Sequence, residues 1–374
     1  MKHAATGMVS GLFVLALLLS CGTPEPRPVW EGWKAVSIRY AEHFQLWERG
    51  ADRLLLTFGP GGNSDTTGIF ALSDPAMNAP FPAGTVPFGR PLQRVALMST
   101  THAPFITGLG CSDAVVGCAH LDRLRDTILL EKARSGRLEE IGTADGMDRE
   151  RILMLAPDAL FTYPYGPSGN TDKVVSVPMV PISEYLEQHP LGRAEWIRAF
   201  GMLFGRQALA DSLFAMIVER YEKASSTVPS GEERPMVFFG SSWKGTWSIP
   251  SGSSYMSRLI GDAGGRYMFA DRHATGNLDI DLETVLQEGG KAEYWGRILE
   301  QDGAVGPSDV AGDDARVLAL PAFKQHACFY ANSSESDLFG QAVMEPDVVL
   351  KDLIGIFHPK LEKERVPRYF KPVQ

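Results

Sequence analysis

The sequence predicts an α/β protein with two parallel-sheet, Rossmann-like lobes that are joined by a single long helix and preceded by a small β-rich extension. Three observations lead to this prediction. Strand-like and helix-like segments alternate after residue 90, a long amphipathic segment lies near the middle of the chain, and the segments on its two sides resemble each other. Strands that alternate with helices favour parallel sheets, and an internal repeat indicates two copies of one unit.

The composition suits two domains with hydrophobic cores. The chain has 374 residues, of which 44% are hydrophobic, and a formal net charge of −9. The negative charge and the lack of a basic run argue against nucleic acid or an anionic membrane surface as a partner. Neither G-x-S-x-G nor H-E-x-x-H occurs, and no carboxylates are paired for acid–base work. We therefore do not expect an enzyme, and we expect a monomer with no resident cofactor or metal.

The first 30 residues have the form of an export signal. Residues 1–20 contain an apolar run that is too short to span a bilayer and suits a signal peptide. The run ends in Leu-Leu-Ser before Cys21, which resembles the lipobox of bacterial lipoproteins. The resemblance implies lipidation of Cys21, an anchor in the cell envelope, and residues 21–30 as a tether. A plain secretory signal with an incidental cysteine is the alternative.

Residues 31–90 predict the β-rich extension, because short strand-like runs are separated by turns rich in glycine and proline. Its sequence GPGGNSDTTG lacks the Lys-Ser/Thr ending of a phosphate-binding loop, which favours a hairpin end. The remaining chain divides into the N-terminal lobe, the interlobe helix and the C-terminal lobe, at residues 91–204, 205–228 and 229–374. In the C-terminal lobe we expect a strand near residues 315–320 and a final helix at residues 346–357. Three further cysteines follow Cys21, namely Cys111, Cys118 and Cys328. We expect buried thiols, with a disulfide between Cys111 and Cys118 as the alternative.

The interlobe helix is predicted from residues 205–226, where apolar residues recur at helical spacing from Leu209 to Tyr221. On each side of it, a strand-like run leads into a polar loop, a helix with a glycine turn, and the pattern D-x-E-x-[I/V]-L. The two copies of this pattern start at Asp148 and Asp281. Two similar lobes on one rigid helix would leave a cleft between them.

The quoted segments resemble a known family. The similar segments are RVALMSTTHAPFITGLGCSDAVVGCA and IGTADGMDRERILMLAPDALFTY in the first half, and SYMSRLIGDAGGRYMF and DLETVLQEGG in the second. The chain is similar to periplasmic binding proteins with a helical backbone, which are the ABC-importer receptors for corrinoids and ferric siderophores. The resemblance covers residues 92–360 and implies that the chain delivers a metal chelate to a membrane permease. It also implies that a glutamate on each lobe docks to permease arginines, here Glu150 and Glu283. The alternative is that both glutamates serve only as acidic residues in the first turn of a helix, where the helix dipole favours a negative charge.

Ligand contacts are expected from polar and aromatic residues in the loops at the strand ends that face the cleft. The candidates are Thr100, Thr101, His102, Tyr163 and Tyr165 in the first lobe, and Trp243, Trp247, Ser253, Tyr255, Arg272, Asn277 and Tyr330 in the second. This set suits a large planar or macrocyclic ligand.

Several alternatives remain open for these candidates. Trp247 also fits a core position, and His102 fits either an axial metal ligand or a loop histidine with ordinary hydrogen bonds. The first-lobe loops show no arginine pair for an anionic catecholate, and the nearby cations are Lys244 and Arg272. The sequence therefore predicts a corrinoid or a ferric siderophore, with haem or another solute as alternatives. A surface lipoprotein that serves an outer-membrane transporter, and a surface glycoside hydrolase, are the competing functions.

Overall fold

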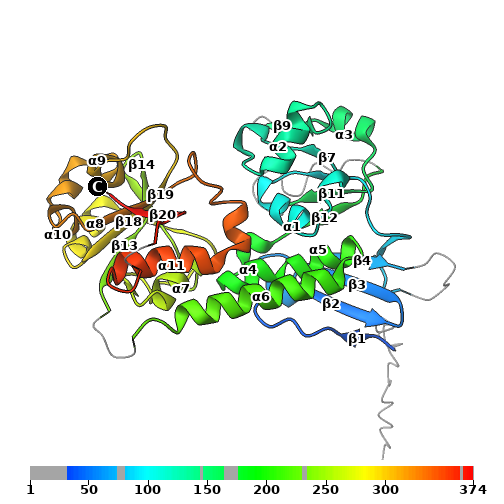
Figure 1. The fold of residues 1–374 in the computed structure, drawn as a ribbon, viewed down its shortest axis with the longest axis horizontal. Helices are drawn as coiled ribbons and strands as arrows, with labels where there is room; N and C mark the ends of the chain where they lie inside the picture. The colour runs from blue at the N-terminus through cyan, green and yellow to red at the C-terminus, as the bar shows by residue number, and fades with distance from the viewer. Residues whose placement is uncertain are drawn as a thin grey trace, which may run out of the picture.

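The computed structural model describes residues 32–73, 81–143, 146–163, 176–229, 234–362 and 365–373. Two α/β lobes stand next to each other above a base of helices, and an N-terminal sheet lies beside one end of this base (Figure 1). The signal peptide, Cys21, the tether and Tyr165 lie outside the described residues. Within the described part of the chain, no helix is both long and apolar enough to cross a lipid bilayer.

The N-terminal extension is a five-stranded sheet in the order β1-β2-β3-β4-β5, in which only the β4–β5 pair is parallel. Its strands are β1 (Lys34–Ala35), β2 (Phe44–Arg49), β3 (Asp52–Phe58), β4 (Thr66–Leu72) and β5 (Val86–Phe88). Alternate residues of β3 enter two different clusters: Leu55 packs into the main core, whereas Leu54 and Leu56 pack with Trp33 on the other face. This two-residue period explains why the sequence reads as strands here.

The N-lobe contains a parallel sheet in the order β12-β11-β6-β7-β8. Its strands are β6 (Val95–Leu97), β7 (Val115–Cys118), β8 (Glu139–Glu140), β11 (Ala159–Thr162) and β12 (Met179–Pro181), and β9 (Gly142–Thr143) pairs separately with β10 (Gly146–Met147). Its helices are α1 (Ala103–Gly108), α2 (Thr127–Arg134) and α3 (Arg149–Leu155). Because β6 is buried on both faces, Val95 and Leu97 join the main core while Ala96 packs in a cluster with Ile152 of α3.

Three consecutive helices connect the lobes: α4 (Pro190–Glu195), α5 (Ile197–Leu203) and α6 (Gln207–Ser225). Gly205 makes the turn between α5 and α6 with φ of 65°, and a side chain there would also meet Pro91. The buried stripe of α6 runs from Ala210 through Phe214 to Tyr221, whereas Leu209, which we assigned to this stripe, is exposed. The Tyr221 hydroxyl donates to Asp262 of the C-lobe at 2.9 Å.

The C-lobe repeats the plan with a sheet in the order β16-β13-β18-β19-β20, whose pairs are parallel except β19–β20. Its strands are β13 (Met236–Phe239), β16 (Arg266–Tyr267), β18 (Tyr294–Leu299), β19 (Cys328–Asn332) and β20 (Phe370–Pro372). A separate antiparallel sheet holds β14 (Ser241–Trp243), β15 (Thr246–Ile249) and β17 (Leu278–Asp281). The two parallel sheets confirm the predicted α/β class and the two lobes.

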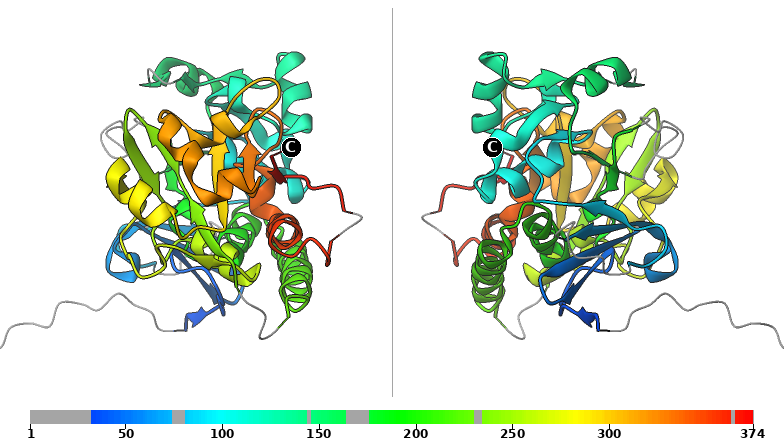
Figure 2. Two further views of the ribbon diagram at one scale, coloured as in Figure 1. Left: turned by 90° about the vertical axis from the view of Figure 1, so that its left-hand side faces the viewer. Right: turned by 90° about the vertical axis from the view of Figure 1, so that its right-hand side faces the viewer.

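The helices of the C-lobe are α7 (Tyr255–Asp262), α8 (Leu282–Gly289), α9 (Pro307–Ala311), α10 (Pro321–Lys324) and α11 (Pro346–Phe357). α11 packs against α6, and the two lie side by side when viewed along their axes (Figure 2). The strand expected at residues 315–320 is instead the 3-10 helix η6 (Ala315–Ala319), because the Asp314 carboxylate accepts a hydrogen bond from the Arg316 N–H and starts a turn. Cys111, Cys118 and Cys328 are free thiols.

Candidate functional site

A cleft of about 270 Å3 lies between the two lobes, where the carboxyl ends of both parallel sheets meet. In sheets of this kind, ligands bind outside the carboxyl ends of the strands. The lining residues come from loops after β6, β7 and β11 of the N-lobe and after β18 and β19 of the C-lobe: Met98, Ser99, Thr100, His120, Arg123, Arg125, Tyr163, Glu300, Ser333, Ser336, Asp337, Leu338 and Phe339.

The N-lobe side of the cleft carries two arginines, Arg123 and Arg125, in the loop after β7. One guanidinium nitrogen of Arg125 donates to the carbonyl of Asp122 at 2.7 Å, which holds the end of this side chain against its own loop. The sequence-based expectation that this lobe lacks an arginine pair is therefore wrong. The error arose because LDRLR was not assigned to the end of β7, where its charges gather at the cleft.

The C-lobe side of the cleft carries two carboxylates, Glu300 and Asp337, and the half-exposed ring of Phe339. Asp337 accepts hydrogen bonds from the N–H groups of Gly340 and Gln341, at 3.1 and 2.8 Å, and so caps the 3-10 helix η7 (Gln341–Met344). Burial raises the pKa of the Asp337 carboxyl, and the charge of Arg125 across the cleft acts in the opposite direction. The cleft therefore places positive and negative groups on opposite lobes.

A smaller cavity of about 160 Å3 adjoins the cleft on the N-lobe side. It shares Ser99 and Tyr163 with the cleft and is completed by Thr101, Glu184 and Tyr185. Ser99 follows β6, Tyr163 follows β11, and Glu184 follows β12, so three neighbouring strands bring these side chains together. Each of the five lining side chains carries a hydroxyl or a carboxyl group, although apolar atoms form most of the cavity surface.

The predicted contacts of the N-lobe divide into two groups. Thr100 and Tyr163 line the cleft, and Thr101 lines the adjoining cavity, so the structure brings these three together. His102 ends the 3-10 helix η2 (Thr100–His102) with its ring inside the core, between Phe161 and Phe200, and is fully buried. Burial lowers the pKa of His102 to about 3, so this ring is neutral at physiological pH and is not presented to the cleft.

The structure does not bring the predicted contacts of the C-lobe to this cleft. Trp247 is 1% exposed and packs against Phe238 and Trp295 at ring distances of 5.4 and 5.5 Å, whereas Trp243 is 73% exposed on β14. The β14–β15 hairpin explains both positions, because alternate residues of a strand point to opposite faces.

The other C-lobe candidates make local contacts. The Ser253 hydroxyl bonds that of Ser251, the Asn277 amide donates to Ser248, and the Arg272 guanidinium lies over Phe269. Tyr330 pairs with Lys371 across β19 and β20, and Tyr255 lies under the guanidinium of Arg193 at 4.6 Å. These residues stay predictions as ligand contacts, and the residues of this lobe that line the cleft follow β18 and β19 instead.

Glu150 and Glu283 occupy equivalent positions on the two lobes. Each is in the first turn of an exposed helix, α3 or α8, and each helix begins at an aspartate whose carboxylate accepts a backbone hydrogen bond: Asp148 from Arg151 at 2.9 Å and Asp281 from Thr284 at 2.7 Å. Both glutamates are exposed. The repeated sequence pattern therefore corresponds to a repeated capped helix.

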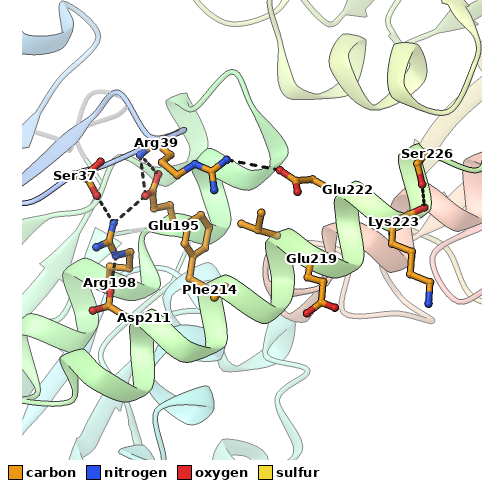
Figure 3. Close-up of a pocket in the computed structure, with 12 residues that line it drawn as sticks. Ser37, Arg39, Glu195, Arg198, Asp211, Phe214, Glu219, Glu222, Lys223 and Ser226 are labelled. Carbon is orange, nitrogen blue, oxygen red and sulfur yellow. Dashed lines mark hydrogen bonds and ion pairs between the residues drawn. The ribbon is translucent and has the colours of Figure 1, made fainter.

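A wider groove of about 770 Å3 runs along α6, on the side of the N-terminal extension (Figure 3). Several of its charged side chains pair with one another: Arg198 contacts Glu195 at 3.1 Å and Asp211 at 2.7 Å, and Arg39 lies 3.7 Å from Glu222. Arg198 also donates to the carbonyl of Ser37 at 2.6 Å, so this contact and the Arg39–Glu222 pair join the extension to α5 and α6. We therefore assign this groove to the attachment of the extension and take the interlobe cleft as the candidate ligand site.

Residues 95–334 match the family described as periplasmic binding protein, and this match covers more than half of the sequence. The chain therefore belongs to the periplasmic binding protein family. The β-rich extension lies outside the matched residues.

Individual relatives agree with this assignment. An uncharacterized lipoprotein of Methanocaldococcus jannaschii is 24% identical over 298 residues, which are 75% of this chain and 68% of that protein. The structure of Helicobacter pylori CeuE in a nickel–histidine complex is similar with a TM-score of 0.60 and 14% identity, over 83% of this chain and 90% of that chain. An ABC-type Fe3+-hydroxamate transport protein of Saccharomonospora viridis gives a TM-score of 0.55 and 17% identity, over 72% and 95% of the two chains.

Proposed function

We propose that this chain is the solute-binding component of an ABC importer and that it captures a metal chelate, either a corrinoid or a ferric siderophore, between its lobes. The observation that carries the proposal is the interlobe cleft, in which the strand ends of two parallel sheets supply aromatic, hydroxyl and charged side chains to one space. The fold likeness to proteins named for Fe3+-hydroxamate transport and for a nickel–histidine complex supports this ligand class. Arg123 and Arg125 extend it to anionic chelates.

We propose further that the protein is held in the cell envelope by lipid on Cys21 and that it faces the periplasm or the outer surface. The lipobox-like sequence and the lipoprotein among the relatives support this anchor. A tethered receptor stays near its permease, which raises the effective concentration at which the two proteins meet.

The delivery step is assigned to Glu150 and Glu283, which would contact arginines on the two halves of a permease dimer. Their support is the equivalent, exposed placement of both carboxylates on capped helices of different lobes. Charge pairs of this kind steer the encounter and fix its register more than they add affinity. A two-fold symmetric permease requires one such group on each lobe.

The test separates binding from delivery. Glu150→Ala and Glu283→Ala should leave chelate affinity unchanged, because neither residue lines the cleft. Each should lower uptake about tenfold, because the encounter with the permease becomes slower and loses its register. Chelate binding is measured on the purified protein and uptake on cells that carry it with its permease. The exposed Glu131, replaced by Ala, is the control. Unchanged uptake in the double variant would contradict delivery to a permease and favour a surface lipoprotein that serves another transporter.

A further inference from the structure

The smaller cavity beside the cleft is lined by a buried carboxylate that has one oxygen atom without a partner. Glu184 is 1% exposed, and its Oε2 atom has no hydrogen-bond partner in the described structure. Its other oxygen, Oε1, lies 3.9 Å from the guanidinium of Arg193, which is an ion pair too long for a hydrogen bond. A buried acceptor without a partner costs about 1–3 kcal/mol, so a native structure that retains one requires an explanation.

Among the described residues, no donor lies within hydrogen-bond distance of the Glu184 Oε2 atom. Arg193 directs its guanidinium over the Tyr255 ring at 4.6 Å, and its Nε atom is also buried without a partner. The hydroxyls of Ser99 and Thr101 bond to each other at 2.9 Å. Burial raises the pKa of the Glu184 carboxyl, while the charge of Arg193, the Thr101 side chain and the N–H groups of Glu184 and Tyr185 lower it. The carboxylate is thus held in place and left incompletely paired.

The size and position of the cavity indicate what can complete this pairing. A volume of about 160 Å3 holds roughly five waters at ~30 Å3 each and is too small for a whole chelate. It opens beside the cleft, with which it shares Ser99 and Tyr163. An ionised carboxylate only accepts hydrogen bonds, and a charged donor gives the strongest bond to it. A short cationic group on a ligand in the cleft would meet these requirements.

We propose that this cavity is a specificity subsite in which the Glu184 carboxylate binds a protonated amine at the edge of the chelate, with the hydroxyls of Ser99 and Thr101 beside it. The inference rests on the proposed function and adds a ligand class to it, namely a metal chelate with a pendant ammonium group. The ammonium replaces water that hydrogen bonds to the cavity in the free protein. Because all residues that line the subsite belong to the N-lobe, the ammonium group can bind there without any contact from the C-lobe.

The test uses two chelates with the same iron centre: ferrioxamine B, which ends in a free amine, and its N-acetyl derivative, which does not. The purified full-length wild-type chain should bind the amine form at least tenfold more tightly, the factor expected for one charged hydrogen bond. Glu184→Gln should bring the ratio of the two affinities close to one. Glu131→Gln, at an exposed site on α2, should keep the wild-type ratio.

Two outcomes would overturn the subsite. The first is equal affinity of the wild type for the two probes, a measurement that does not depend on the folding of any variant. The second is a Glu184→Gln variant that keeps the wild-type ratio of affinities. Binding of cobalamin, haem or another chelate without binding of ferrioxamine B would overturn this inference and leave the proposed function standing. If no chelate binds, the proposed function fails as well.

Discussion

At the cleft, the N-lobe presents two arginines, Arg123 and Arg125, whereas the C-lobe presents two carboxylates, Glu300 and Asp337. The lobes share one plan, since in each a parallel sheet turns its carboxyl ends to the same space. The difference shows that the sheets set where the site lies and the loops after the strands set its charge. A ligand that spans this cleft is therefore oriented by the charge difference between the lobes.

The same comparison extends to the segments attached to each lobe. In the base beneath the N-lobe, the buried Glu195 carboxylate accepts hydrogen bonds from the N–H groups of three successive extension residues at 2.8–3.1 Å: Arg39, Tyr40 and Ala41. In the C-lobe, the buried Asp352 carboxylate does the same for Arg368, Tyr369 and Phe370 of the C-terminal segment at 2.7–3.3 Å. A second buried carboxylate, Glu187, also holds the extension by accepting from the N–H groups of Glu42 and His43 at 2.8 and 3.1 Å. Buried carboxylates thus fasten both added segments.

The largest expected effect comes from breaking these attachments. Glu195→Gln and Asp352→Asn should each lower the free energy of unfolding by about 3 kcal/mol, because an amide removes the charge from a buried, fully used acceptor and adds a donor that faces other donors. Urea denaturation monitored by circular dichroism measures this. Glu222→Gln, which alters only the exposed contacts of this side chain with Arg39 and with the Tyr40 hydroxyl, should have a small effect. If Glu195→Gln is no more destabilising than Glu222→Gln, the buried carboxylate does not hold the extension.

The charge difference across the cleft gives the next effect. Replacing both Arg123 and Arg125 by Ala should weaken binding of an anionic ferric catecholate about 100-fold, since each lost charged contact is worth roughly 1.5 kcal/mol. Replacing Glu300 by Gln and Asp337 by Asn should change the affinity in the opposite direction, because two like charges leave the cleft. Calorimetric titration of both double variants measures the changes. Shifts of the same sign would show that the lobes do not orient the ligand by charge.

The cores beneath the cleft differ in a way that predicts a pH effect. The N-lobe core contains His102, whose pKa burial lowers to about 3, whereas the buried ring of the C-lobe hairpin is Trp247, which does not titrate. Below pH 6.5 the unfolded chain binds a proton at His102 and the folded chain does not, so stability falls as the pH drops from 6.5 towards 3. Between pH 7 and pH 5 this residue should account for a loss of about 2 kcal/mol.

His102→Phe should remove this part of the pH dependence, because a ring of similar size fits beside Phe161 and Phe200. Unfolding free energies at pH 7 and pH 5 are compared for the variant and the wild type. His273→Gln, at an exposed position, should behave like the wild type. The account of His102 as a buried neutral ring is contradicted if the His102→Phe variant loses as much stability as the wild type.

The parts of the fold that the sequence predicts well are those set by local pattern. α11 spans the predicted residues, Pro346–Phe357, because proline starts it and an apolar stripe continues to its end. The two D-x-E-x-[I/V]-L segments begin helices because an aspartate at the N-cap is a local signal. The strand predicted at residues 315–320 was wrong because the Asp314 turn outweighs β propensity there.

The site was harder to predict because burial is decided by tertiary packing. The run Ser-Thr-Thr-His reads as a polar loop, but its 3-10 turn leaves two threonines at the cavities and turns His102 into the core. Glu184 could not be recognised as a cavity residue, because it lies in a mostly polar stretch. Only its position after β12 places it beside the cleft. The loop positions of Arg123 and Asp337 could have been found by examining the residues after every predicted strand.

The central claim is that the interlobe cleft binds a metal chelate, and a fluorescence titration tests it most directly. The purified protein is titrated with cobalamin, haem and a panel of ferric siderophores while the emission of its tryptophans is recorded. Absorbing ligands in the cleft should quench the buried Trp196, Trp247 and Trp295 in the lobes and their base. Saturable quenching by one chelate class at micromolar or lower concentration is the predicted result. No response to any of them from the folded protein would contradict the claim.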